Sequence, residues 1–364
     1  MHQDIKPRRD KRAGIYIHVP FCERICPYCD FAVTSVRQVP HEQYADAVIQ
    51  EFEHRKDALD GRTVRSIYFG GGTPSRMDAT HLMRVLNHVR NLPACDAVEE
   101  ITVEANPLDI TPEVARIWAD SGVTRVSLGC QSFQDEVLEA LGRQHGGKQA
   151  REATCMLLAY GFQVTVDLIY GHRTQTHALW HRDLDTIQTL IREHGLNHVS
   201  AYHLTIEEGT RFGRLTRKGA TLVQGEQESR VLVDELRAAL SEVGVEPYEV
   251  SSYGRLGCES VHNSNYWMGG EYLGLGMGAH GFHIDEARGV LRTVNDVHLK
   301  EYMARPLESR TLELVSWSEH LDERLFVAMR SQFGVDVSEL VHQFSLSKTQ
   351  QASICERLQA LTDA

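Results

Sequence analysis

The sequence of 364 residues has no long hydrophobic run, and no stretch approaches the roughly 18 apolar residues that a membrane-spanning helix needs. Residues 1–13 carry five basic side chains and are not followed by the apolar segment of a signal peptide. Low-complexity segments and internal repeats are also absent. We therefore expect a cytoplasmic protein with a solvated basic tail over residues 1–13, and peripheral contact with a membrane stays open.

An excess of positive charge is missing as well. The chain has 38 lysine and arginine residues against 50 aspartate and glutamate residues, a formal net charge of −12. Nonspecific nucleic-acid binding needs a basic surface that displaces counterions from phosphate, so this balance argues against it. With 42% hydrophobic and 24% charged residues, the composition is that of an ordinary globular protein, long enough for two domains or for one barrel with additions.

A secreted disulfide framework would be shorter than 364 residues and denser in cysteine than this chain with its eight, so we expect a reducing compartment. Three of them, Cys22, Cys26 and Cys29, form a C-x3-C-x2-C cluster. Three thiolates on a short loop suit an iron–sulfur cluster, whereas a structural zinc site usually has two pairs of ligands. Zinc with a distant histidine as the fourth ligand, or a disulfide with a spare thiol, remains an alternative.

Three protein ligands leave one iron of a four-iron cluster open to another molecule. S-adenosylmethionine can bind that iron through its amino and carboxylate groups, and an electron from the cluster can then break a C–S bond of the sulfonium. In such a site the cofactors supply the difficult chemistry, while the protein positions and shields them.

Short strand-like segments alternate with helical patterns from about residue 14 to 210. The expected strands span 14–20, 63–69, 100–104, 124–129, 164–170 and 198–204. The expected helices span about 41–58, 78–92, 112–121, 135–142, 148–160 and 177–194. This alternation predicts an α/β fold with a parallel sheet, and the pattern alone fits either an incomplete barrel or an open doubly wound sheet.

The carboxyl ends of parallel strands are where such folds collect their binding groups, and here those ends carry unusual residues. They are the cysteine cluster, the Gly70–Pro74 segment, Glu104, Gln131, Asp167, and Tyr202 with His203. After about residue 210 we expect a helix at 224–243, a glycine-rich stretch at 268–281 and a hairpin at 280–295. From about 297 onward the pattern predicts helices alone, at 297–304, 317–332, 336–343 and 347–361.

The cysteine spacing, with an aromatic Tyr28 before the last cysteine, resembles the signature of the radical S-adenosylmethionine superfamily. The blocks IYIHVPFC, YFGGGTPS, VEANP, GCQSF and DLIYG resemble the oxygen-independent coproporphyrinogen III oxidase group over about residues 14–335. The resemblance implies an incomplete parallel (β/α)6 barrel over 14–215 and a barrel extension over 216–299. A smaller, mainly helical C-terminal domain over 300–364 would then be a truncated relative of a winged-helix domain.

The resemblance also implies cofactor contacts. Cys22, Cys26 and Cys29 would ligate a [4Fe-4S] cluster, with Tyr16 packed beside the cofactor. The backbone of Gly71, Gly72 and Thr73 would meet the methionine amino group, which a glycine can approach closely because it has no Cβ. The remaining implied contacts, to the methionine carboxylate, the ribose and the rest of the cofactor, are Glu104, Gln131, Arg143, Asp167, Tyr28 and Tyr202.

Two features distinguish this chain within that group. The oxidases carry a further cysteine two positions after the third, where this chain has Phe31, and residues 262–267 read H-N-x-x-Y-W. Both features resemble the HemW-type heme chaperones. That resemblance implies His262 as an axial ligand of heme iron, with Tyr266 and Trp267 stacking on the porphyrin. Cys258 is an alternative ligand, and the glycine-rich residues 272–281, with His280, are expected to line the same cleft.

The implied function is a heme chaperone that passes heme to heme-requiring proteins, with membrane cytochromes as candidate recipients and a homodimer as a candidate assembly. Oxidative decarboxylation of coproporphyrinogen, or radical chemistry on another tetrapyrrole, remains an alternative. Two departures from the group stand out: residues 172–176 read HRTQT where the family has a proline-containing loop, and the C-terminal region is short.

Overall fold

A computed structural model describes residues 12–285, 289–308 and 310–362, so most of the expected basic tail lies outside the described residues. Its centre is six parallel strands in the sheet order β1-β4-β5-β6-β7-β8. Their bounds are β1 Arg12–Val19, β4 Thr63–Gly71, β5 Glu100–Ala105, β6 Arg125–Gln131, β7 Gln163–Tyr170 and β8 His198–His203. All six strands lie where the sequence predicts them, which confirms the α/β class.

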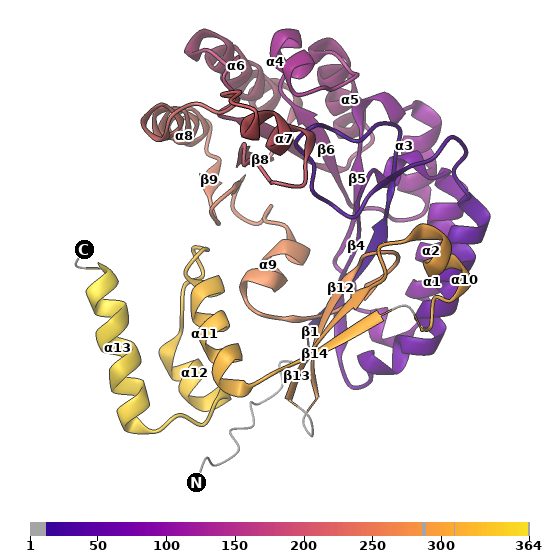
Figure 1. The fold of residues 1–364 in the computed structure, drawn as a ribbon, viewed down its shortest axis with the longest axis vertical. Helices are drawn as coiled ribbons and strands as arrows, with labels where there is room; N and C mark the ends of the chain where they lie inside the picture. The colour runs from indigo at the N-terminus through magenta and orange to yellow at the C-terminus, as the bar shows by residue number, and fades with distance from the viewer. Residues whose placement is uncertain (1–11, 286–288, 309, 363–364) are drawn as a thin grey trace.

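The barrel is incomplete, because β8 and β1 do not pair with each other. Their outer neighbours are β10 Ser252–Gly254 and β11 Glu271–Leu275, respectively. Figure 1 shows the resulting curved sheet, with the helices ranged along its outer side. The fold class is therefore the incomplete parallel barrel that the resemblance implied.

Helices cross between successive strands and bury their apolar faces against the sheet. They are α1 His41–Arg55, α2 Ala79–Arg90, α3 Pro112–Asp120, α4 Asp135–Ala140, α5 Gly147–Ala159 and α6 His177–His194. Local sequence determines where several begin: Asp78, Thr111 and Thr176 each accept a backbone N–H bond as the N-cap of the helix that follows. Trp118 and Trp180 are fully buried between these helices and the sheet.

The sheet continues beyond β11 through antiparallel strands. The predicted hairpin is confirmed as β12 His280–Asp285 and β13 Gly289–Asn295, and the edge strand is β14 Arg310–Val315. The expectation of helices alone after residue 297 was therefore wrong at β14. This strand lies at the sheet edge with Leu312 and Leu314 exposed, so it lacks the buried apolar alternation that identifies most strands. On the far side of the sheet, β9 Glu246–Pro247 is the other edge strand.

The remaining elements follow the barrel strands or end the chain. They are β2 Phe21–Cys22, β3 Thr34–Ser35, α7 Arg211–Arg217, α8 Glu226–Ser241, α9 Val261–Trp267, α10 Leu299–Ala304, α11 Trp317–Ala328, α12 Val337–Gln343 and α13 Lys348–Thr362. Figure 1 shows α11, α12 and α13 grouped together, with α9 between that group and the barrel. The last helices share a small core that includes Leu340, Phe344 and Ile354. No helix among the described residues is long and apolar enough to cross a membrane.

Candidate cofactor-binding site

A cavity of about 410 Å³ opens at the carboxyl ends of the parallel strands. Its lining includes every residue predicted to contact the cluster or S-adenosylmethionine except Tyr16: Cys22, Cys26, Tyr28, Cys29, Gly71, Gly72, Thr73, Glu104, Gln131, Arg143, Asp167 and Tyr202. Because these residues come from six different strands or the loops after them, the barrel brings them together from a span of 180 positions in the chain. The unusual residues 172–176 are not part of this lining.

The cysteine loop follows β1 directly. Cys22 ends β2, and a backbone hydrogen bond from Cys29 N to Cys26 O (3.1 Å) closes the turn that brings the other two thiols to the cavity. All three cysteines are free and half-buried. Burial raises the pKa of Cys22 to about 11 and also raises the pKa of Cys29, so both thiols bind protons at neutral pH when no metal is present. A metal or cluster would replace those protons.

Arg143 is the cation next to these thiols. Its Nη1 donates to Cys26 Sγ (3.4 Å) and its Nη2 to the carbonyl oxygen of Gly129 (2.9 Å). Its buried Nε has no hydrogen-bond partner among the described residues. Arg143 thus places positive charge where thiolate charge would develop, and it keeps one donor available in the cavity.

The glycines after β4 are required by the chain's own packing. Gly71 has a φ of 111°, which disfavours any residue with a side chain. A Cβ on Gly72 would lie 2.7 Å from the backbone of Pro20, so the loop presses directly on the end of β1. The Gly71 N–H donates to Glu104 Oε2 (3.0 Å), which ties this loop to β5. Packing thus gives a second reason for these glycines beside the predicted approach to a ligand.

Two carboxyl groups line the cavity, Glu104 from β5 and Asp167 from β7, two strands that flank β6. The Tyr68 hydroxyl donates to Glu104 Oε1 (2.7 Å), and Ser127 Oγ donates to Asp167 Oδ2 (2.9 Å). Asp167 Oδ1 is buried without a hydrogen-bond partner among the described residues. Burial, together with the charge of Glu104, raises the pKa of Asp167 to about 8.

Sequence reasoning did not identify Ser127, although it lines the cavity and orients Asp167. Its position two residues before Gly129 on β6 places both residues on the same face, which is the signal that could have found it. Gln131, at the end of β6, has a φ of 66°, an uncommon conformation for a residue with a side chain. Three free thiols, an orphaned carboxylate oxygen and an orphaned guanidinium nitrogen in one cavity fit a cluster with a polar, charged co-ligand.

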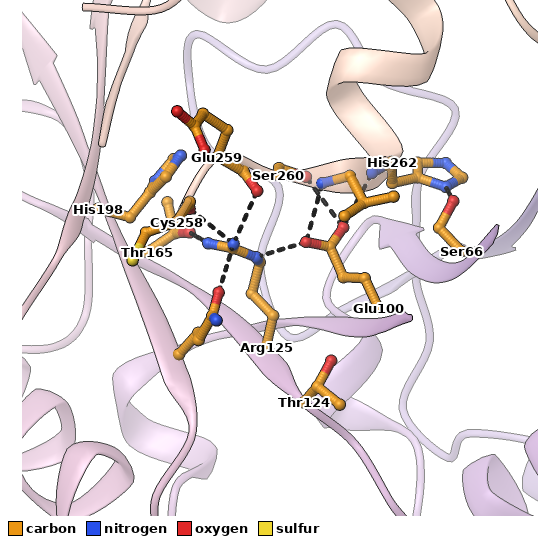
Figure 2. A network of polar contacts seen from close by, with 12 residues as sticks. Ser66, Glu100, Thr124, Arg125, Thr165, His198, Cys258, Glu259, Ser260 and His262 are labelled. Atoms are coloured by element: carbon orange, nitrogen blue, oxygen red, sulfur yellow. Dashed lines mark hydrogen bonds and ion pairs between the residues drawn. The ribbon is translucent and has the colours of Figure 1, made fainter. Parts of the chain in front are cut away.

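The helix that carries the H-N-x-x-Y-W residues is anchored by buried charge, as Figure 2 shows. Glu100 accepts hydrogen bonds from Ser260 Oγ (3.1 Å), Val261 N (3.0 Å) and His262 N (2.9 Å) at the start of α9. Arg125 Nε donates to the same carboxylate (2.8 Å). Burial alone would raise the pKa of Glu100, but Arg125 and these N–H donors outweigh it, and the pKa lies below its usual value.

Arg125 also fixes the loop before α9. Its Nη2 donates to the carbonyl oxygens of Cys258 (2.8 Å) and Glu259 (3.2 Å), as well as to Gln163 Oε1 (2.6 Å). The Cys258 residue is thus held through its backbone. His280, the other residue predicted near this segment, is exposed at the start of β12.

His262 is fully buried, and both of its ring nitrogens are engaged. Nδ1 hydrogen-bonds with Ser66 Oγ (2.8 Å) and Nε2 with the Tyr266 hydroxyl (2.8 Å). The ring stacks on Tyr68 with a centroid distance of 4.8 Å, and burial lowers the pKa of His262 to about 4. Its predicted role as an iron ligand therefore stays a prediction, and it would require one of these hydrogen bonds to break. Tyr16, which also lies outside the cavity, stacks near Tyr68 and His262 at 6.1 and 6.4 Å.

A second cavity of about 590 Å³ lies beside the C-terminal end of α9. Tyr266 and Trp267 line it, so the predicted H-N-x-x-Y-W segment contributes its two aromatic residues here and not to the cavity at the strand ends. The rest of the wall comes from Gly269 and Gly270 after α9 and from β11, β12, β13 and α11. Sequence reasoning did not identify the α11 part, because nothing in the local pattern indicates that α11 packs beside α9.

Comparison with known proteins places this geometry in a family. The Radical SAM superfamily model matches residues 16–187. The chain is 35% identical to the protein named heme chaperone HemW of Lactococcus lactis, over 93% of this chain and 86% of that protein. It is 33% identical to heme chaperone HemW of Escherichia coli, covering 82% and 77% of the two chains.

A mitochondrial relative and a solved structure extend the comparison. The chain is 34% identical to radical S-adenosyl methionine domain-containing protein 1 of Bos taurus, over 89% of this chain and 74% of that one. The structure of coproporphyrinogen III oxidase HemN from Escherichia coli superposes with a TM-score of 0.75 at 22% identity, covering 94% and 80% of the chains, which shows a shared fold. The chain belongs to the HemW family of the radical SAM superfamily.

Proposed function

We propose that this protein is a heme chaperone that binds heme and delivers it to heme-requiring proteins. The observation that carries the proposal is the 35% identity to a protein named heme chaperone HemW over 93% of the chain. The absence of a cysteine at position 31 also supports it, because Phe31 is largely exposed beside the cysteine loop and offers no further thiol.

The cavity at the strand ends is proposed to hold a [4Fe-4S] cluster and S-adenosylmethionine. Cys22, Cys26 and Cys29 would ligate the cluster, which supplies one-electron reduction when bound. The orphaned Asp167 Oδ1 would accept from the ribose hydroxyls, and the free Nε of Arg143 would donate to the methionine carboxylate. The other predicted contacts, Tyr16, Tyr28, Gly71, Gly72, Thr73, Glu104, Gln131 and Tyr202, would shape and shield this space.

The heme would lie against the H-N-x-x-Y-W segment, whose aromatic rings offer the flat apolar surface that a porphyrin needs. The predicted role of His262 as the iron ligand belongs to this proposal. Recipients would be heme-requiring proteins such as cytochromes, reached from solution or from peripheral contact with a membrane. A homodimer is the proposed assembly.

Transfer of heme is the direct test. The cluster-loaded protein, charged with one equivalent of heme under anaerobic conditions, is mixed with an apo-cytochrome of the b type, and the recipient's spectrum is followed. A parallel sample keeps the two proteins on opposite sides of a dialysis membrane. We expect faster transfer in the mixed sample, because delivery requires contact. Equal rates of heme transfer in the mixed sample and in the separated sample would reject delivery by this protein.

A parallel assay addresses the enzymatic alternative. The same preparation, with S-adenosylmethionine and a reductant, is incubated with coproporphyrinogen III and the products are separated. We expect no protoporphyrinogen, and its accumulation over time would replace the chaperone with an oxidase.

A further inference from the structure

We propose that the cavity between α9, α11 and the strands β11–β13 is the heme-binding site, and that His320 of α11 ligates the heme iron. The proposal rests on the proposed function, since it assigns the site at which that function's heme binds. It differs from the sequence prediction, which placed the iron ligand at His262.

The size and chemistry of this cavity suit a large aromatic ligand. Its volume of about 590 Å³ is within the range of about 300–1,000 Å³ typical of cofactor sites. Its aromatic lining comes from three separate parts of the chain: Tyr266, Trp267, Tyr272, Phe282 and Phe326. Aromatic rings stack on porphyrins, and their apolar faces exclude water from the ring.

His320 is the residue in this lining that can bind iron through nitrogen. It is 2% exposed, and neither Nδ1 nor Nε2 has a hydrogen-bond partner among the described residues. The imidazole is enclosed by Phe282 and Phe344, each at a centroid distance of 5.4 Å, and by Trp317 at 6.3 Å. An unsatisfied buried polar group costs about 1–3 kcal/mol, so an unpartnered imidazole is unusual unless a ligand engages it.

The protonation state of His320 fits this role. Burial, reinforced by the charges of Arg324 and Arg292, lowers the pKa of His320 to about 4. The ring is therefore neutral at physiological pH, and one nitrogen carries a lone pair. Neutral imidazole is a common axial ligand of heme iron.

His262 has the opposite environment. Its two nitrogens are already bonded to Ser66 and Tyr266, so it has no lone pair to offer without losing a partner. The bond to the Tyr266 hydroxyl instead holds in place one of the rings that line the cavity. We assign His262 as a positioning residue for that wall and His320 as the ligand.

Charge in the lining does not select the ligand by itself. Arg292 and Arg324 are present together with Asp322 and Glu323, and Arg292 forms an ion pair with Glu323 at 2.5 Å. The stacking surface and the unpartnered imidazole carry the proposal.

The test uses the full chain, cluster-loaded and anaerobic, titrated separately with ferric heme and with metal-free protoporphyrin. The variants are His320→Ala, His262→Gln and His194→Ala, in which His194 is an exposed histidine on α6 that serves as the matched control. We expect His320→Ala to lose the imidazole-ligated Soret and paramagnetic resonance signatures and at least about tenfold in heme affinity. Metal-free porphyrin has no iron to ligate, so its affinity in His320→Ala should change less than about threefold. Added free imidazole should restore the iron spectrum.

His262→Gln should keep the iron signature of the unchanged protein, with weaker binding of both porphyrins because the Tyr266 wall loosens. If His320→Ala keeps the original spectrum and affinity, the assignment is overturned, and loss of the signature in His262→Gln would return the ligand to His262. A protein that binds no heme in any form would reject the proposed function itself, which is a separate result.

A second variant, at an exposed residue of the cavity, tests the site even if His320→Ala does not fold. Phe326 lines the cavity with 64% of its surface exposed, so Phe326→Ala should fold normally. We expect it to weaken binding of both porphyrins by about threefold or more, because a stacking surface is lost. Unchanged affinity for both porphyrins in a folded Phe326→Ala would count against this cavity.

Discussion

At the scale of residues, Glu100 and Arg125 are the buried charges on which the position of α9 depends. They are 4% and 2% exposed, and they satisfy each other while Glu100 also binds the first turn of α9. Removing one member of such a pair leaves the other as an uncompensated buried charge, which is strongly destabilising. The stability of the helix that carries His262 therefore depends on a contact that spans 162 positions in the chain.

Glu100→Ala should reduce the free energy of unfolding by about 3–5 kcal/mol, because Arg125 stays buried without its partner. The control is Glu99→Ala in the adjacent position, where the exposed carboxylate pairs with Arg65 and should contribute less than about 1 kcal/mol. Urea denaturation measures both values. Similar small losses in the two variants would contradict the role of Glu100.

Cys22, Cys26 and Cys29 line the cavity at the strand ends, whereas the other five cysteines do not. Cys26→Ala should abolish the iron content and visible absorption of the reconstituted protein, because three thiolates are needed to hold the cluster. Cys355→Ala removes an exposed thiol on α13 and should leave both unchanged. Iron analysis and absorbance after anaerobic reconstitution give the answer, and full iron content in Cys26→Ala would reject the ligand assignment.

At the scale of elements, α9 shows what local pattern could and could not predict. The barrel strands were predictable because each is a buried run of β-branched and aromatic residues between turn formers. The seven residues of α9 are too few for a periodic signal, and its N-terminus depends on Glu100 from β5. The edge strand β14 was missed because its leucines face solvent.

The same limit applies to the sites. Strand ends in a parallel sheet converge by topology, so the lining of the first cavity could be predicted from position alone. The second cavity is lined by residues from 266–292 and from 320–327, and no sequence motif indicates that these two segments lie together. His320 is identified by its unpartnered ring nitrogens, which become visible only in three dimensions.

Ser260 is the N-cap of α9 and provides a test of this element. Its Oγ accepts from Asn263 N (3.3 Å) and donates to Glu100, so Ser260→Ala should cost about 1 kcal/mol or more. Amide hydrogen exchange should quicken over residues 261–267. Ser316→Ala, which removes the N-cap of α11, should leave exchange in α9 unchanged. No change in α9 exchange in Ser260→Ala would show that the cap does not stabilise this helix.

At the scale of the whole molecule, the two cavities are joined by contacts between aromatic and polar side chains. Glu104 in the first cavity accepts from Tyr68, Tyr68 stacks on His262, and His262 bonds with Tyr266 in the second cavity. A ligand that displaces Glu104 or Tyr266 would therefore change the surroundings of His262. These contacts physically connect the strand-end cavity with the cavity proposed to bind heme.

Buried neutral histidines also determine how the molecule responds to acid. Burial lowers the pKa of His18 and of His145 to about 4, against about 6.5 in an unfolded chain. Between these values the unfolded state binds more protons, so stability is full above about pH 6.5 and is lost as the pH falls towards 4. The urea concentration at the midpoint of unfolding should decrease steadily as the pH is lowered from about 6.5 to 4. In His145→Gln this decrease should be smaller. An identical pH profile in that variant would contradict the assignment to His145.

An anaerobic titration of the cluster-loaded protein with heme shows whether the chain binds heme at one defined site. Gel filtration then removes loosely held heme before the Soret absorbance is read. We expect saturation near one heme per chain, with an imidazole-ligated spectrum that survives filtration. Uptake that rises without saturation, or heme that is lost on the column, would contradict it.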